Sequence, residues 1–196
     1  MSIRTEEDLL RSLGHTDPAQ EIPARARPSQ LIQQSDENDW HTPRRYIDAA
    51  RRVLGSIDLD PASSPAANAT VGAAEIFTES DNGLSREWKG RIWLNPPYGR
   101  KAGDFTLRLC ELYQSGSVSA AVLLVNAHCT DTGWFQPLWA HTLCFTDHRI
   151  DFDGGGRSKK STSTHGSVFA YLGPDAAAFA TEFAVFGAVV RRWALL

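Results

Sequence analysis

Cysteine, net positive charge and long apolar runs are all scarce in this sequence, and each shortage excludes a class of protein. Its three cysteines, Cys110, Cys129 and Cys144, are far apart and form no CxxC pair. That spacing excludes a cysteine-rich zinc site and fits a reducing cytoplasm. The formal net charge of -3 argues against a protein that holds nucleic acid by bulk positive charge, so any such contact must be local.

Signals for a membrane, for secretion and for a common nucleotide-binding loop are also missing. The longest apolar run, near residues 118–125, is much shorter than a membrane span. The amino terminus carries early acidic residues and no apolar core, so we expect no secretory signal. His128, His141 and His148 show no metal-ligand spacing, and no GxGxxG occurs. These patterns predict a cytoplasmic protein with no membrane partner and no bound metal.

The 196 residues fit one domain with a sizeable core and a loose arm. We predict that residues 1–38 form an arm that is largely disordered or contains one short helix, because residues 18–38 are polar, carry Pro23 and Pro28 and show no periodicity. The ordered domain is expected at residues 39–196.

Strand-type and helix-type segments alternate within residues 39–196. Residues 120–125 form a continuous apolar run, typical of a strand buried on both faces. Thr42 is predicted to cap a helix that begins at Pro43 and stops at Gly55. The alternation predicts an α/β fold with a mostly parallel central sheet flanked by helices. The predicted strands are 56–60, 75–78, 91–94, 120–125, 142–146, 167–172 and 185–190; the predicted helices are 43–54, 103–114, 132–140 and 175–183; loops are expected after residue 60 and at 153–166.

The segment Asn95-Pro96-Pro97-Tyr98, called the catalytic loop below, directly follows the predicted strand at 91–94. Its two prolines remove two backbone donors, so the loop presents acceptors. The side-chain oxygen of Asn95 and the carbonyl of Pro96 can converge on one planar amino group and aim its lone pair at a methyl donor. Tyr98 offers a flat face on which a base taken out of a duplex can stack. All four residues are therefore predicted to be catalytic.

Asp58 and Asp60 lie at the end of another predicted strand. Because parallel strands have their carboxyl ends at one edge of a sheet, Asp60 and Asn95 are expected to lie at the same edge. Open α/β sheets bind ligands there, so a cofactor and a reacting group should meet at this edge.

In its ordered set of motifs the sequence resembles the phage-type DNA adenine-N6 methyltransferases, over roughly residues 39–172. The ordered set is far more specific than any one motif. The matching segments are residues 40–43 (WHTP), 58–63 (DLDPAS), 68, 77–78, 81–84, 88, 93–99, 132–135 and 149–152.

This resemblance implies a Rossmann-like class I methyltransferase fold with a contracted cofactor half. Only about thirty residues separate Pro61 from Arg91, and two full βα units hardly fit there. The resemblance also implies S-adenosylmethionine as cofactor. The residues that it implies for cofactor binding are Trp40, Thr42, Pro43, Asp58, Asp60, Pro61, Ala62 and Asp81.

Target-recognition elements follow the catalytic loop in enzymes with this order of motifs, so residues 149–166 are the candidate recognition loop. Cations among its glycines and hydroxyls can contact phosphates or reach a groove of double-stranded DNA, the implied partner. A solvated loop is the alternative interpretation. The residues expected to contact DNA are Arg100, Lys101, Arg149, Arg157, Lys159 and Lys160.

The resemblance thus implies site-specific methylation of the exocyclic amino group of a flipped adenine, in a phage-encoded or bacterial enzyme connected with restriction and modification. Two alternatives stay open. The same chemistry could act on cytosine N4, an RNA base or a protein glutamine, or a decayed methyltransferase could only hold nucleic acid. The sequence does not choose between a monomer and a weak dimer.

Overall fold

The computed structural model describes residues 40–154, 161–162 and 164–192, all within a compact unit that spans Asn38–Leu196. The arm predicted for residues 1–38 lies outside the described residues. The helices are α2 (Arg44–Leu54), α3 (Pro65–Val71), α4 (Arg100–Gln114) and α5 (Ala176–Phe183), with 3-10 turns η2 (Glu79–Asp81), η3 (Gly83–Ser85), η4 (Ala127–Cys129), η5 (Gln136–Ala140) and η6 (Ala184–Phe186). The strands are β1 (Trp40–His41), β2 (Leu59–Asp60), β3 (Glu75–Ile76), β4 (Gly90–Leu94), β5 (Val118–Asn126), β6 (Thr142–Thr146), β7 (Asp151–Gly154), β8 (Ser161–Thr162), β9 (Ser167–Leu172) and β10 (Gly187–Arg191).

The main sheet has seven strands in the described part of the chain, in the order β10-β6-β9-β5-β4-β2-β3. Strands β3, β2, β4 and β5 are parallel to their neighbours in that half. In the other half β9 is antiparallel to both β5 and β6, and β10 is antiparallel to β6. The predicted α/β fold is confirmed, but the sheet is mixed rather than mostly parallel. Where the connection from β6 to β9 is described, at residues 147–154, 161–162 and 164–166, it carries no crossover helix, and a connection of that kind suits antiparallel strands.

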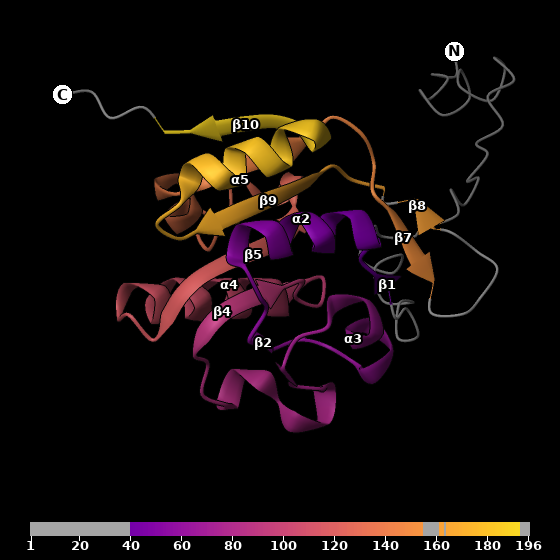
Figure 1. The fold of residues 1–196 in the computed structure, drawn as a ribbon, viewed down its shortest axis with the longest axis vertical. Coiled ribbons are helices and arrows are strands. Elements are labelled where there is room, and N and C mark those ends of the chain that lie inside the picture. The colour runs from indigo at the N-terminus through magenta and orange to yellow at the C-terminus, as the bar shows by residue number, and fades with distance from the viewer. Residues whose placement is uncertain (1–39, 155–160, 163, 193–196) are drawn as a thin grey trace, which may run out of the picture. The chain divides into compact units, whose positions relative to one another are not determined.

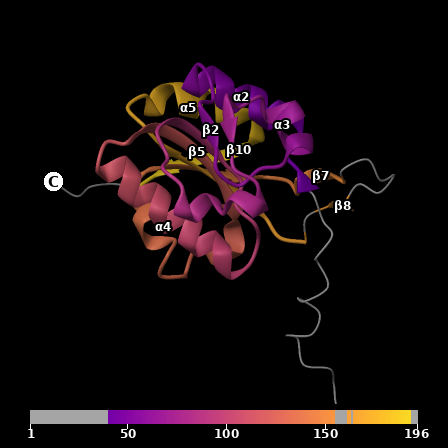
Figure 2. The same ribbon diagram turned by 90° about the horizontal axis from the view of Figure 1, so that it is seen from below.

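Helices cover both faces of this sheet, with α2, α3 and α5 on one side and α4 on the other (Figures 1 and 2). Strand β5 shows why the core is continuous: Val122 and Leu124 pack in the cluster with α2 and α5, while Leu123 and Val125 pack in the cluster with α4. Successive side chains of a strand point to opposite faces. The uninterrupted apolar run of β5 therefore serves two layers, as the sequence predicted.

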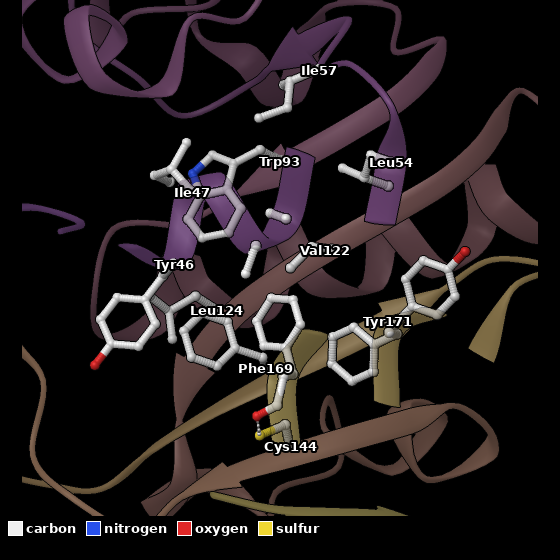
Figure 3. Close-up of a cluster of buried hydrophobic side chains, with 14 of the residues drawn as sticks. Tyr46, Ile47, Leu54, Ile57, Trp93, Val122, Leu124, Cys144, Phe169 and Tyr171 are labelled. Carbon is white, nitrogen blue, oxygen red and sulfur yellow. Dashed lines mark hydrogen bonds between the residues drawn. The ribbon is translucent and has the colours of Figure 1, made fainter. Parts of the chain in front are cut away.

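The cluster on the α2 side is rich in aromatic rings (Figure 3). Phe169 is fully buried and lies between Tyr46 of α2, at 5.3 Å between ring centroids, and Phe183 of α5, at 5.0 Å. Trp93 of β4 lies 6.5 Å from the same ring. This packing fixes α2 against the strand that leads into the catalytic loop.

Helix α3 replaces part of the predicted loop after residue 60. The Ser64 side chain accepts a hydrogen bond from Ala67 N at 3.1 Å, Pro65 is the first helical residue, and Gly72 ends the helix at φ 58°. These are ordinary start and stop signals in a Pro/Ala/Ser-rich segment. The segment lacks an apolar stripe, so periodicity gave no sign of the helix.

The prediction of a helix at residues 132–140 was wrong, because only the 3-10 turn η5 forms there.

The predicted start of α2 also needs correction. Pro43 occupies the cap position without a side-chain cap bond, and the helix begins at Arg44. Thr42 is not the cap; its hydroxyl instead accepts a hydrogen bond from Asn95, 53 residues away. The Thr42 hydroxyl therefore bonds to a residue far away in the chain rather than to a backbone amide of the helix that it precedes.

A second, three-stranded sheet has the order β1-β7-β8. In its antiparallel ladders Trp40 pairs with Gly154, His41 with Asp153, and Phe152 with Ser161. The prediction that residues 153–166 are entirely loop was wrong, because strands β7 and β8 reach into that segment. Its Gly/Ser-rich composition hides the pairing, since the ladder depends on backbone groups rather than on an apolar alternation.

Candidate active site

The order of the strands reverses between β2 and β4. From β2 the chain moves outward to β3, then returns to form β4 on the other side of β2. A crevice forms outside the carboxyl ends of the strands at such a point, and α/β sheets bind ligands there. Asp60 ends β2 and Asn95 follows β4, so both predicted residues lie at this edge.

The Asn95 side chain is half-buried, and its amide nitrogen donates a hydrogen bond to the Thr42 hydroxyl at 3.2 Å. Its amide oxygen is buried and has no hydrogen-bond partner. Buried polar atoms nearly always have a partner, so an unpartnered acceptor needs an explanation. A substrate N–H donor would satisfy this oxygen.

Tyr98, the last residue of the catalytic loop, is 53% exposed. Its ring meets the buried Phe152 of β7 edge-on, at 6.4 Å between centroids and 84° between planes. Desolvation raises the pKa of Tyr98 to about 12, so the hydroxyl stays neutral at physiological pH. The large exposed fraction of the side chain is the feature that suits stacking. Gly99 follows at φ 88°, a left-handed conformation that turns the chain into α4.

Asp60 is 3% exposed, and its carboxylate accepts a hydrogen bond from Ala62 N at 3.2 Å. Desolvation by burial raises the pKa of Asp60 from 3.8 to about 7. A carboxyl group with a strongly shifted pKa at a ligand-binding edge is a candidate functional residue. Its titration should also make the free energy of unfolding depend on pH.

We predict that the free energy of unfolding falls less between pH 4 and pH 7 in Asp60→Asn than in the wild type. The folded pKa lies above the unfolded value, so the contribution of Asp60 is fully present below about pH 4 and is lost as pH rises through about 7. A shift of about three units corresponds to at most roughly 4 kcal/mol. Urea unfolding of both proteins across this range should show the wild type losing that stability relative to the variant. Parallel curves would contradict a buried, weakly acidic Asp60.

The loop after Asp60 is held by the turn at residues 81–83. A Cβ added to Gly83 would lie 2.0 Å from the Pro61 carbonyl oxygen, so a glycine is needed for this close approach. Asp81 itself accepts hydrogen bonds from the Thr78 amide and hydroxyl, at 2.8 and 2.6 Å, in a capping box. The Thr78 hydrogen bonds lower the pKa of Asp81. The turn therefore supports the Pro61 loop.

Asp58 lies at the far end of β2 from the catalytic loop. Its carboxylate accepts hydrogen bonds from Arg91 Nε at 2.9 Å and Nη2 at 2.8 Å, and from the Arg91 backbone amide at 2.8 Å. The Arg91 side chain thereby lowers the pKa of Asp58. Arg91 precedes Asn95 by four residues, about 13 Å along a strand. A cavity of about 570 Å³, lined in part by Asp58 and Gly90, lies at this end of the sheet and so away from the catalytic loop.

The remaining predicted site residues fall into three groups. Pro43, Pro61 and Ala62 lie near the edge that carries Asp60 and Asn95, whereas only the backbone of Trp40 is described, in strand β1. Three exposed cations follow the catalytic loop in sequence: Arg100 and Lys101 begin α4, and Arg149 precedes β7. Lys101 is paired with Glu79 at 3.8 Å. Arg157, Lys159 and Lys160 lie outside the described residues.

Two residues at this site were absent from the predicted set. Phe152 supports Tyr98, and His41 has a buried Nε2 atom without a hydrogen-bond partner, next to Thr42 in the chain. Both lie in segments that matched known motifs, WHTP at 40–43 and RIDF at 149–152. The motifs were thus the only signal for them, because neither residue type indicates a site by itself.

In a comparison with protein families, residues 29–191 match the family described as DNA N-6-adenine-methyltransferase (Dam). The chain belongs to this family. The match covers most of the chain, including the catalytic loop and both sheets, and it confirms the predicted resemblance and the Rossmann-like methyltransferase fold. Membership in the DNA N-6-adenine-methyltransferase family indicates in general an enzyme that methylates adenine in DNA. The search of curated proteins finds no match.

Two observations complete the description of this DNA N-6-adenine-methyltransferase family member. Within the described ranges, no group of three or more His, Cys, Asp or Glu side chains is arranged to hold a metal ion. In the same part of the chain, no helix has the length and apolar character needed to cross a membrane.

Proposed function

We propose that this chain transfers a methyl group from S-adenosylmethionine to the exocyclic amino group of an adenine that has swung out of double-stranded DNA, at a specific sequence. The observation that carries the proposal is the Asn95 carboxamide, whose buried oxygen lacks a partner while its nitrogen is held by Thr42. The exposed ring of Tyr98 lies three residues further along the same loop.

The residues of the catalytic loop act by binding and orienting the amino group. The Asn95 oxygen accepts one of its two hydrogens, and the Pro96 carbonyl is proposed to accept the other. This arrangement withdraws the nitrogen lone pair from the ring and meets the positive charge that develops on nitrogen with fixed dipoles. The Tyr98 ring stacks on the extruded base. The loop needs no strong base before transfer, because the acidified N–H can lose its proton afterwards.

S-adenosylmethionine, when bound, supplies an electrophilic methyl group on a sulfonium. The proposed binding residues are Trp40, His41, Thr42, Pro43, Asp60, Pro61 and Ala62. The buried Asp60 carboxyl group and the unpartnered His41 Nε2 fit a polar ligand at this edge of the sheet. We leave out Asp58 and Asp81, because their carboxylates are engaged by Arg91 and Thr78.

Arg100, Lys101 and Arg149 are the described cations proposed to contact DNA phosphates, and Arg157, Lys159 and Lys160 extend this proposal to residues 155–160. All three described side chains are exposed. Because the net charge is -3, the attraction must come from such a local set rather than from the whole protein. Phosphate contacts position a protein on DNA, whereas base contacts choose the sequence.

The purified full chain should transfer labelled methyl from S-adenosylmethionine to double-stranded DNA, and nucleoside digestion should recover the label as N6-methyladenine. The same assay on RNA, on a protein extract and on DNA without adenine tests the alternative acceptors. Recovery of the label as N4-methylcytosine, a methylated RNA base or methylglutamine would replace the proposed substrate. Tight DNA binding without any transfer would favour a decayed enzyme.

A further inference from the structure

The small sheet β1-β7-β8 meets the catalytic loop through two side chains. Thr42 directly follows β1 and contacts Asn95, while Phe152 lies in β7 and contacts Tyr98. The antiparallel register pairs Trp40 with Gly154 and His41 with Asp153, and the pair His41–Asp153 directly precedes Thr42 and directly follows Phe152 in the chain. One residue that follows β1 and one residue in β7 therefore touch the first and last residues of the catalytic loop.

We propose that Thr42 and Phe152 are positioning residues, through which the small sheet sets the orientation of the Asn95 carboxamide and the Tyr98 ring. This inference rests on the proposed function, because orientation matters only if Asn95 and Tyr98 hold the target base. It adds two residues that act through others, and it gives the small sheet a role in the reaction.

The Asn95 carboxamide has two ends with opposite hydrogen-bonding character. With its nitrogen on Thr42 Oγ1, at 3.2 Å, the oxygen is left as the free atom. A half-turn of the carboxamide would present N–H donors to an amino group that itself donates. Thr42 is 5% exposed, so water does not readily replace its hydroxyl as the acceptor. The Thr42 hydroxyl thus holds the carboxamide by its nitrogen, which leaves the oxygen free to accept a substrate hydrogen.

Phe152 restrains the other end of the loop. It is 3% exposed and packed in the core with α2 and α5, so its ring is fixed. The edge-on contact to Tyr98 limits the tilt of a ring that is otherwise 53% exposed, and aromatic pairs favour this geometry. One part of the Tyr98 ring is therefore held while the rest stays open for a base. Strand β7 lies in the first, described part of the candidate recognition segment, residues 149–154, so this part contacts the loop through Phe152.

The first test compares Thr42→Val, which keeps the shape and removes the acceptor, with Thr42→Ser, which restores a hydroxyl. We expect Thr42→Val to lower kcat for methyl transfer to DNA about tenfold, with the KM for DNA nearly unchanged. Thr42→Ser should recover most of the lost kcat. Circular dichroism and thermal unfolding establish that both variants are folded.

A second measurement does not depend on activity. In ¹⁵N-labelled protein, the side-chain amide signals of Asn95 are those that disappear in Asn95→Asp. We expect their hydrogen exchange to be slow in the wild type and in Thr42→Ser, and at least about tenfold faster in Thr42→Val. Equal exchange in all three proteins would overturn the role of Thr42 even if the enzyme assay failed.

Phe152→Leu tests the second contact, with Phe186→Leu as its matched control. Both rings belong to the same buried cluster, but Phe186 packs on Tyr46, at 4.7 Å, and not on Tyr98. We expect Phe152→Leu to lower kcat about three- to tenfold, while Phe186→Leu costs similar stability and leaves kcat within about twofold of the wild type.

The outcomes separate this inference from the proposed function. Wild-type kcat in both Thr42→Val and Phe152→Leu would overturn positioning, as would a loss confined to the Kd for S-adenosylmethionine. If the wild type transfers no methyl to DNA, the proposed function fails, and the exchange measurement still decides whether Thr42 holds the Asn95 carboxamide.

Discussion

Asn95→Ala is expected to lower methyl transfer to DNA by about a hundredfold or more, with the affinity for S-adenosylmethionine nearly unchanged. Removing one hydrogen-bonding group that stabilises developing charge typically costs 10²- to 10³-fold in kcat. The Asn95 oxygen is a buried acceptor without a partner, so its loss removes the contact proposed to the reacting nitrogen. Single-turnover transfer and calorimetric titration with the cofactor measure the two quantities separately.

Asn126→Ala provides the matched control. Asn126 is the last residue of β5, the strand next to β4, so its position resembles that of Asn95. Its side-chain oxygen, however, has a partner: it accepts a hydrogen bond from the His128 amide at 2.8 Å and caps η4. We expect the free energy of unfolding of this variant to fall by about 0.5–2 kcal/mol, while most of its activity is kept. Near-normal transfer by Asn95→Ala would rule out the role proposed for the loop.

The largest effect on stability is expected for Phe169→Ala. Phe169 is fully buried on β9 beside Tyr46 and Trp93 (Figure 3), and its ring also packs on Phe183, at 5.0 Å between centroids. Truncating a buried phenylalanine to alanine usually costs about 3–5 kcal/mol, through lost burial and a residual cavity. Domains are typically stable by about 5–15 kcal/mol. The free energy of unfolding in urea should fall by that amount, and folding should become marginal.

Val185→Ala is the comparison for this prediction. Val185 is 74% exposed, so its truncation should change the free energy of unfolding by less than about 0.5 kcal/mol. Equal effects of the two substitutions would mean that Phe169 does not lie in a close-packed core.

Local sequence patterns predicted the main strands of the sheet well. The apolar run at 120–125 lies within β5, and residues 142–146 and 167–172 are β6 and β9 as predicted. These strands are buried on both sides by helices, so their apolar character shows directly in the sequence. Elements whose signal is weak were predicted less well. Helix α3 has caps but no apolar stripe, and β7 pairs through its backbone within a Gly-rich segment.

At the site, too, the sequence predicted some features of the catalytic loop and not others. The sequence alone predicted a set of candidate catalytic residues, because two prolines after a strand leave acceptors and an aromatic ring on one short loop. It could not predict which partner each side chain would have. Thr42 had an equally good local role as a helix cap, and its bond to Asn95 spans 53 residues. Similarly, Asp58 and Asp60 look alike in the sequence, yet one is paired with Arg91 and the other is buried with a pKa of about 7.

The sequence by itself determined the alternation of strands and helices, the position of the catalytic loop after a buried strand, and the ordered motifs that mark the family. Those features depend on residue type and on short spacing, which the chain carries wherever it folds. Only the tertiary structure decided the antiparallel half of the sheet, the small sheet beside the loop and the orientation of Asn95 and Tyr98. Each of these depends on contacts between segments far apart in the chain, and their free energies arise only when packing brings the partners together.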